Sequence, residues 1–225
     1  MYHKKKVLVI VAHSDDETIG CGGYIKKLSI SNYEVKAISF TDGISSRGRS
    51  ILKKKERIKK SIKASKILGF QWLKRFNFPD NALDSIPLIK IIKKIENIKK
   101  KFNPELLITH NFSDLNIDHR IIAEAALTAF RPEPNSKLKK FITFEVPSST
   151  DFRNLKKKNF HPNLYIDIND TINFKLKALS CYESEIKKYP HSRSKKAIEN
   201  LAKIRGNQVG LKFAESFEII RHVEK

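Results

Sequence analysis

Groups that bind metal ions or move protons are concentrated directly after the first apolar run of the chain. The segment VLVIVAHSDDETIGCGG, residues 7–23, passes from six apolar residues to His13, Asp15, Asp16 and Glu17. An imidazole and several carboxylates this close together are typical of a metal site or of general acid–base catalysis. The segment therefore points to chemistry at the end of a buried strand.

A second polar segment has the same relation to another apolar run. THNFSDLNIDHR, residues 109–120, ends the apolar run at 105–110 and contains His110 and His119. In a mostly parallel α/β sheet, ligands bind at the edge where the strands have their carboxyl ends. If the two strands are neighbours, His13 and Asp16 can meet either His110 or His119 at that edge.

Two imidazoles and one carboxylate form a ligand set suited to a catalytic zinc ion with one position open for water. Zinc would lower the pKa of that water from about 15.7 toward ~7. Fe²⁺, Co²⁺ and Ni²⁺ also accept such ligands. Adjacent residues in an extended turn point in different directions, so Asp16 can bind the metal while Asp15 acts as general base. Cys21 follows closely, although a small packed thiol beside glycine is commoner than a ligand.

Strands and helices alternate along the chain. Apolar runs predict strands at residues 5–12, 34–40, 70–76, 105–110, 139–145, 163–167 and 214–221. Helical periodicity and capping residues predict helices at about 18–29, 50–68, 87–102, 118–130, 170–185 and 195–209. This order indicates an α/β fold with a mostly parallel central sheet covered on both faces. No repeat or linker divides the chain, so a single domain at 1–225 is expected.

The composition narrows the classes of function. The chain has 45 basic and 24 acidic residues and a formal charge of +21, but no helix-turn-helix, zinc-finger or RNP-like motif, so specific nucleic-acid binding is not expected. A positive surface would instead steer an anionic small substrate toward a cleft. Apolar runs fall short of the ~20 residues of a membrane span. Two cysteines and the lack of a signal-peptide pattern favour the cytoplasm.

The segment AHSDDETIGCGG resembles the AHPDDE signature of the PIG-L/LmbE-like zinc-dependent N-deacetylases, with Ser14 in place of the usual proline. The similarity continues in the family's order over nearly the whole chain, in the blocks FTDG, FPDN, DLNIDHR, FEVPSST, YPHSRS and RGNQVGLKFAESF. The resemblance implies a Rossmann-like three-layer sandwich. A short acidic motif alone would be weak, whereas its pairing with the DH block is specific.

The resemblance also implies roles for individual residues. His13, Asp16 and His119 match the family's metal ligands, and Asp15 matches its general base. The implied reaction removes an N-acetyl group from an N-acetylglucosamine-type sugar conjugate, with a zinc-bound water as nucleophile. One alternative is a zinc hydrolase of another amide, such as a thiol-linked glucosamine conjugate. Another is a non-catalytic polyanion-binding protein that retains the metal site.

Other residues are candidates for substrate binding or for support of the ligands. Arg57 matches a substrate-contacting arginine of the family. The alternative interpretation is that it is one more basic residue on a basic helix. Asn116 stands where some members carry a histidine, so proton return would fall on Asp15. Asp118 is expected to cap a helix and to orient a group of the site. His110 fits either a pocket role or a buried, hydrogen-bonded histidine.

Asp114 is predicted to be a turn residue. Arg47 and Arg49, in a loop near the predicted site, are further candidates for substrate contact, and His191 and Arg193 have no role that the sequence defines. The basic surface favours a substrate that carries phosphate, such as a nucleotide- or lipid-linked sugar. The oligomeric state and the group attached to the sugar are not encoded in any recognisable motif.

Overall fold

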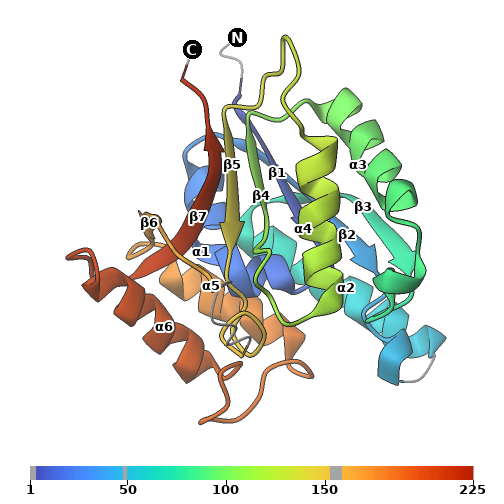
Figure 1. Cartoon of the computed structure of the whole chain (residues 1–225). Coiled ribbons are helices and arrows are strands. Elements are labelled where there is room, and N and C mark those ends of the chain that lie inside the picture. The colour runs from blue at the N-terminus through green and yellow to red at the C-terminus, as the bar shows by residue number, and fades with distance from the viewer. Residues whose placement is uncertain (1–3, 48–49, 153–158, 225) are drawn as a thin grey trace.

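A seven-stranded, mostly parallel sheet forms the centre of the protein in the computed structural model, which describes residues 4–47, 50–152 and 159–224 (Figure 1). The strands are β1 (Lys6–Val11), β2 (Glu34–Thr41), β3 (Gln71–Phe78), β4 (Leu106–His110), β5 (Lys140–Phe144), β6 (Leu164–Asp167) and β7 (Ala214–His222). They are arranged in the order β3-β2-β1-β4-β5-β7-β6, in which β7 is antiparallel to both of its neighbours. The predicted α/β class is confirmed.

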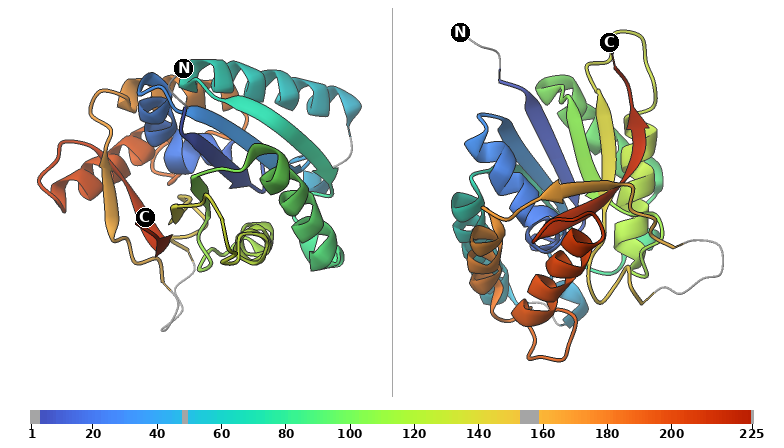
Figure 2. Two further views of the ribbon diagram at one scale, coloured as in Figure 1. Left: turned by 90° about the horizontal axis from the view of Figure 1, so that it is seen from above. Right: turned by 90° about the vertical axis from the view of Figure 1, so that its left-hand side faces the viewer.

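Helices cover both faces of this sheet and make three layers (Figure 2). They are α1 (Asp16–Ile30), α2 (Ile51–Leu68), α3 (Leu88–Phe102), α4 (Ile117–Ala129), α5 (Ile172–Leu179) and α6 (Lys195–Asn207). Helices α1, α2 and α5 pack together on one face with α6 beside α5, and α3 and α4 pack together on the other. Within the described ranges, none of the helices has the length and apolar character needed to cross a membrane.

The uninterrupted apolar run of β1 follows from its place between the two helical layers. Val7, Val9 and Val11 belong to the core beneath α1, α2 and α5, whereas Leu8 and Ile10 belong to the core beneath α3 and α4. Successive side chains of a strand point to opposite faces, so a strand covered on both sides needs apolar residues at every position. The two cores together fix β1, and with it the start of the polar segment.

The helix ends follow from local sequence. Ser50 caps α2 by accepting a hydrogen bond from the backbone N–H of Lys53 (3.3 Å), and Gly69 ends this helix with a φ of 83°. Glycine adopts this left-handed conformation without steric cost. Pro87 is the residue before α3, one position earlier than predicted for a proline in the first turn. Its missing N–H is harmless in either position.

Most of the predicted elements differ from the observed ones by one or two residues at an end, and one helix differs by more. The helix predicted at 170–185 is wrong in its second half, because α5 ends at Leu179 and continues only as the short 3₁₀ helix Ser180–Tyr182. The chain leaves the helical path there, and Glu185 reaches a side chain of α2. The strand predicted at 70–76 is β3, displaced toward the carboxyl end.

Candidate metal centre

The polar segments after β1 and β4 lie at the same edge of the sheet. β1 pairs in parallel with β4, with Val7 opposite Leu106 and Ile10 opposite Thr109. The condition that the sequence left open, that these strands are neighbours, is therefore met. His13 follows β1 directly, and the loop after β4 leads into α4, whose first turn carries His119.

Three side chains meet at this edge. His13 Nδ1 lies 3.1 Å from Asp16 Oδ2 and 3.2 Å from His119 Nε2. Asp16 Oδ2 and His119 Nε2 are 3.4 Å apart, and all three residues are buried. A tetrahedral ion with bonds of about 2.0–2.1 Å needs ligand atoms separated by roughly 3.3–3.4 Å. The spacing and the donor types both fit a zinc-like ion, and His13, Asp16 and His119 form one of the metal-compatible groups among the described residues.

Carboxylates face the second nitrogen of each of these histidines. His13 Nε2 lies 3.1 Å from Asp80 Oδ1 and 3.3 Å from Asp118 Oδ2. His119 Nδ1 lies 3.1 Å from Asp114 Oδ2. A carboxylate in this position fixes the tautomer and the ring orientation of a ligating histidine. His13, Asp80 and Asp118 are also close enough to hold an ion themselves, but their arrangement around one ring nitrogen matches this supporting role.

Asp118 supports the site but does not cap the helix. α4 begins at Ile117, and the cap is Asn116, whose Oδ1 accepts hydrogen bonds from the backbone N–H groups of Asp118 (2.9 Å) and His119 (3.4 Å). The carboxylate of Asp118 instead accepts the N–H groups of Asn81 (2.7 Å) and Leu83 (2.9 Å). The capping prediction for Asp118 is wrong because the helix starts one residue earlier than expected. Asn116 thereby orients the turn that carries His119.

Asp114 is more than the predicted turn residue. Its Oδ1 accepts the N–H of Asn116 at 2.8 Å, as a turn aspartate does, but its Oδ2 faces His119 and also accepts the hydroxyl of Thr150 at 2.7 Å. The hydroxyl of Ser149 donates to Asp114 Oδ1. Burial would raise the pKa of Asp114, but the charge of His119 and these hydrogen bonds lower it to about 2. The sequence signal for this role of Asp114 was its position as an acidic residue shortly after a strand, at the edge of the sheet where ligands bind.

Of the two alternatives for His110, the structure shows the buried, hydrogen-bonded histidine. Its Nε2 accepts the N–H of Ala12 at 2.9 Å, and its ring stacks on that of His119 with centroids 3.9 Å apart. Burial, together with the charge of His119, lowers the pKa of His110 to about 4. His110 is therefore a neutral ring packed behind His119, and His119 completes the metal-compatible group.

Asp15, which precedes Asp16, pairs with a buried arginine. Arg57 Nη2 donates to Asp15 Oδ1 at 2.9 Å, and Arg57 Nη1 donates to Glu185 Oε1 at 3.0 Å. Asp15 is only 2% exposed. Burial raises the pKa of Asp15, and the charges of Arg57 and Arg193 oppose that rise. The two neighbouring aspartates thus have separate partners, and the sequence gave no sign of Glu185.

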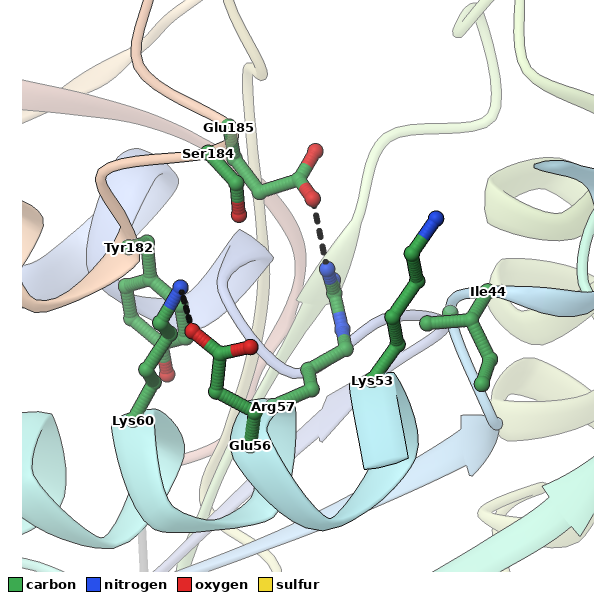
Figure 3. Close-up of a pocket in the computed structure, with 9 residues that line it drawn as sticks. Ile44, Lys53, Glu56, Arg57, Lys60, Tyr182, Ser184 and Glu185 are labelled. Atoms are coloured by element: carbon green, nitrogen blue, oxygen red, sulfur yellow. Dashed lines mark hydrogen bonds and ion pairs between the residues drawn. The ribbon is translucent and has the colours of Figure 1, made fainter. Parts of the chain in front are cut away.

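A hollow of about 240 Å³ adjoins Arg57 (Figure 3). It is lined by Gly43, Ile44, Lys53, Glu56, Arg57, Lys60, Tyr182, Ser184 and Glu185. Lys53 and Arg57 extend from α2 toward the segment that carries Glu185, and Lys60 pairs with Glu56 at 2.8 Å. A Cβ atom at Gly43 would lie 2.4 Å from Arg57 Nε, so a glycine is needed there for the guanidinium to reach Asp15.

The remaining candidates have other surroundings. Arg193 donates to the hydroxyl of Ser148 at 2.6 Å, and its charge acts on Asp15. Cys21 is buried inside α1 and belongs to neither of the metal-compatible groups found in the described ranges. Arg49 and the side chain of Arg47 lie outside the described residues.

Glu17 is a buried acid to which the sequence analysis assigned no individual role. Its Oε1 accepts the hydroxyl groups of Thr18 (2.7 Å) and Tyr182 (3.2 Å). Burial raises the pKa of Glu17 to about 8, so this side chain holds its proton at neutral pH. It therefore adds no negative charge next to Asp15 and Asp16 under those conditions.

A buried group of two histidines and one aspartate, at the carboxyl edge of a parallel sheet and with a further carboxylate beside it, defines a class of metal-dependent hydrolases. The family model described as PIG-L, GlcNAc-PI de-N-acetylase, matches residues 8–130, which is more than half of the chain. The protein therefore belongs to the PIG-L family. The predicted family and the predicted enzyme class, a deacetylase, are confirmed.

Three relatives illustrate the similarity. A diacetylchitobiose deacetylase of Thermococcus kodakarensis is 25% identical over 96% of this chain and 83% of its own length. A probable N-acetyl-alpha-D-glucosaminyl L-malate deacetylase 2 of Bacillus cereus is 25% identical over 81% of this chain and 84% of its own. The solved structure of N,N'-diacetylchitobiose deacetylase from Pyrococcus horikoshii superposes with a TM-score of 0.77, at 25% identity, over 96% of this chain and 84% of that one.

Proposed function

We propose that this protein is a metal-dependent hydrolase that removes the N-acetyl group from an N-acetylglucosamine-containing conjugate. The observation that carries the proposal is the buried triangle of His13, Asp16 and His119, with Asp15 next to it in the chain. Membership of the PIG-L family and the names of the relatives support the reaction type. Among the residues that the structure describes at this edge, no feature supports a polyanion-binding role.

His13, Asp16 and His119 would hold the ion, and zinc is the metal that this donor set favours. When bound, the metal supplies Lewis acidity to the amide carbonyl and to the attacking water. The supporting carboxylates Asp80 and Asp114 keep the two imidazoles in the orientation that binding requires.

Asp15 is the proposed general base. A buried carboxylate whose pKa is raised by its surroundings takes a proton from water more readily than an exposed one, and it can return that proton to the leaving amine. Arg57 holds one oxygen of Asp15, and its positive charge limits this rise in pKa and so favours the ionised carboxylate that a base requires. Asn116 caps α4 and cannot deliver a proton, so Asp15 serves both proton transfers.

The hollow beside Arg57 is the proposed place for the part of the substrate beyond the acetamido group. At about 240 Å³ it is smaller than the pockets of roughly 300–1,000 Å³ that hold drug-sized ligands. This wall carries three cations, Lys53, Arg57 and Lys60, and two carboxylates, of which Glu56 pairs with Lys60 and Glu185 with Arg57. Alternating donors and acceptors of opposite charge favour a hydroxyl-rich unit, such as one sugar ring, over a phosphate group.

Acetate release from a panel of substrates tests the proposal. The zinc-loaded protein is offered N-acetylglucosamine, diacetylchitobiose, N-acetylglucosaminyl malate, a thiol-linked glucosamine conjugate, and nucleotide-linked and lipid-linked N-acetylglucosamine, with the Asp15→Asn variant as control. Release from one class, lost in the variant, is the expected result and identifies the substrate. If no substrate releases acetate while one zinc ion per chain is bound, the sugar deacetylase assignment is wrong.

A further inference from the structure

Helix α1 changes direction five residues after the predicted ligand Asp16. Cys21 has a φ of −140° and a ψ of 23° inside this helix, so residues 16–20 and the segment that follows are two helical pieces joined by a kink. The first four N–H groups of a helical segment have no acceptor within that segment. A kink in a buried helix therefore needs an acceptor from elsewhere in the protein.

Glu215 supplies that acceptor from the far end of the chain. Its Oε1 accepts the N–H of Gly23 at 2.8 Å, and its Oε2 accepts the N–H of Tyr24 at 2.7 Å. Glu215 lies in β7, and the hydrogen bond to Gly23 spans 192 positions of sequence. A carboxylate at the start of a helical segment also interacts favourably with the helix dipole. Glu215 thus acts as the N-cap of the second piece of α1.

The charge of this cap is neutralised inside the protein. Lys175 of α5 places its Nζ 2.6 Å from Glu215 Oε1, and both side chains are at most 5% exposed. The glycines after the acidic motif leave room for the neighbouring elements. A Cβ atom at Gly22 would lie 3.3 Å from the side chain of Lys175, and one at Gly23 would lie 2.9 Å from that of Ile168. The close approach of Lys175 and Ile168 therefore explains the two glycines that end the GCGG run.

We infer that Glu215 is a positioning residue for the metal centre, which it serves by fixing the kink of α1. The first piece of α1 begins with Asp16 and follows Asp15, so the angle at Cys21 sets where both carboxylates stand relative to His13. Because Glu215 caps the second piece, that piece starts along an axis different from that of the first piece. Glu215 and Lys175 lie outside residues 8–130, the part of the chain that the family model matches.

A double variant and a matched control separate this positioning role from a simple contribution to stability. Glu215→Gln removes the charge and one of the two acceptor oxygens, but it leaves Lys175 as a buried cation without its partner, which threatens folding. The double variant Glu215→Gln/Lys175→Met removes both charges together, so the fold is kept while the capping carboxylate is lost. Phe102→Leu is the matched control, because it reduces packing in the core at the opposite edge of the sheet.

Three readouts are measured on the full chain. Hydrogen exchange follows the amides of Gly23 and Tyr24, visible absorption of the Co²⁺-loaded protein follows the coordination geometry, and kinetics separates kcat from KM. In the double variant we expect faster exchange at these two amides, an altered Co²⁺ spectrum, and a kcat lower by about 10- to 100-fold, the usual cost of losing support for a ligand. Phe102→Leu is expected to lower the Tm without changing the exchange, the spectrum or kcat.

An unchanged Co²⁺ spectrum in the folded double variant would overturn the inference, as would the same spectral change in Phe102→Leu. The inference rests on the proposed function only through its kinetic readout. If the wild-type protein releases no acetate, the proposed function fails, whereas exchange and Co²⁺ absorption still decide the role of Glu215.

Discussion

Replacing Asp114 by asparagine changes one buried charge at constant shape. Asp114 Oδ2 lies 3.1 Å from His119 Nδ1, and neither side chain is exposed. The N–H of Asn116 and the hydroxyl of Thr150 donate to the two oxygens of Asp114. An asparagine has one oxygen, and because the backbone N–H of Asn116 can only donate, that oxygen faces Asn116 and the amide nitrogen faces the imidazole. The ring of His119 then loses the acceptor that fixes its orientation.

The expected effect on metal affinity depends on pH. Loss of a carboxylate behind a ligating histidine costs about 10- to 100-fold in affinity, or roughly 1.4–2.7 kcal/mol. In protein stripped of metal, burial opposes protonation of His119, but the charges of Asp16 and Asp114 raise its pKa to about 9. Protons therefore compete with the metal below that pH in the wild type. Asp114→Asn lowers the pKa of His119 and weakens this competition, so the affinity deficit shrinks as the pH falls.

Competition with a chromophoric chelator for Zn²⁺ measures this dependence. At about pH 9.5, where proton competition is small, the variant should bind zinc about 10- to 100-fold more weakly than the wild type, and at about pH 7 the gap should be narrower. Asp84→Asn, at an exposed position, is the control and should bind as the wild type does. Equal affinities at the higher pH, or a deficit that widens toward neutrality, would refute the reasoning.

Three further predictions concern the base and its arginine. Asp15→Asn should lower turnover by about 10²- to 10⁴-fold with zinc affinity changed less than about tenfold, whereas His119→Ala should lose both; equal loss of zinc binding would show that base and ligand are exchanged. Arg57→Met removes the cation that pairs with the buried carboxylates of Asp15 and Glu185 and should lower the urea-derived free energy of unfolding by about 3–5 kcal/mol, and an unchanged transition midpoint would contradict the buried pairing. Gly43→Ala should lower kcat/KM and stability more than Gly210→Ala, because both glycines have positive φ but only Gly43 meets Arg57; equal effects would remove the steric argument.

The sequence by itself determined the sheet, its helical layers and the chemistry of one edge. Apolar residues at every position of β1 required a strand buried on both faces, and the polar residues directly after it had to lie at the carboxyl edge. The types and spacing of His13, Asp15 and Asp16 indicated metal binding beside a base. The choice between His110 and His119 came only from the family resemblance before the structure was considered.

Tertiary structure decided which groups surround those residues. Asp80 and Asp114 face His13 and His119 because the loops after β3 and β4 converge there, and loop conformation is poorly encoded in local pattern. Glu185 and Glu215 act on α1 and α2 from the last quarter of the chain. Local sequence determines helices, strands and the order of polar segments, because those depend on neighbouring residues. Contacts over more than a hundred positions depend on how the layers pack, so the partners of each buried charge were decided only by the folded protein.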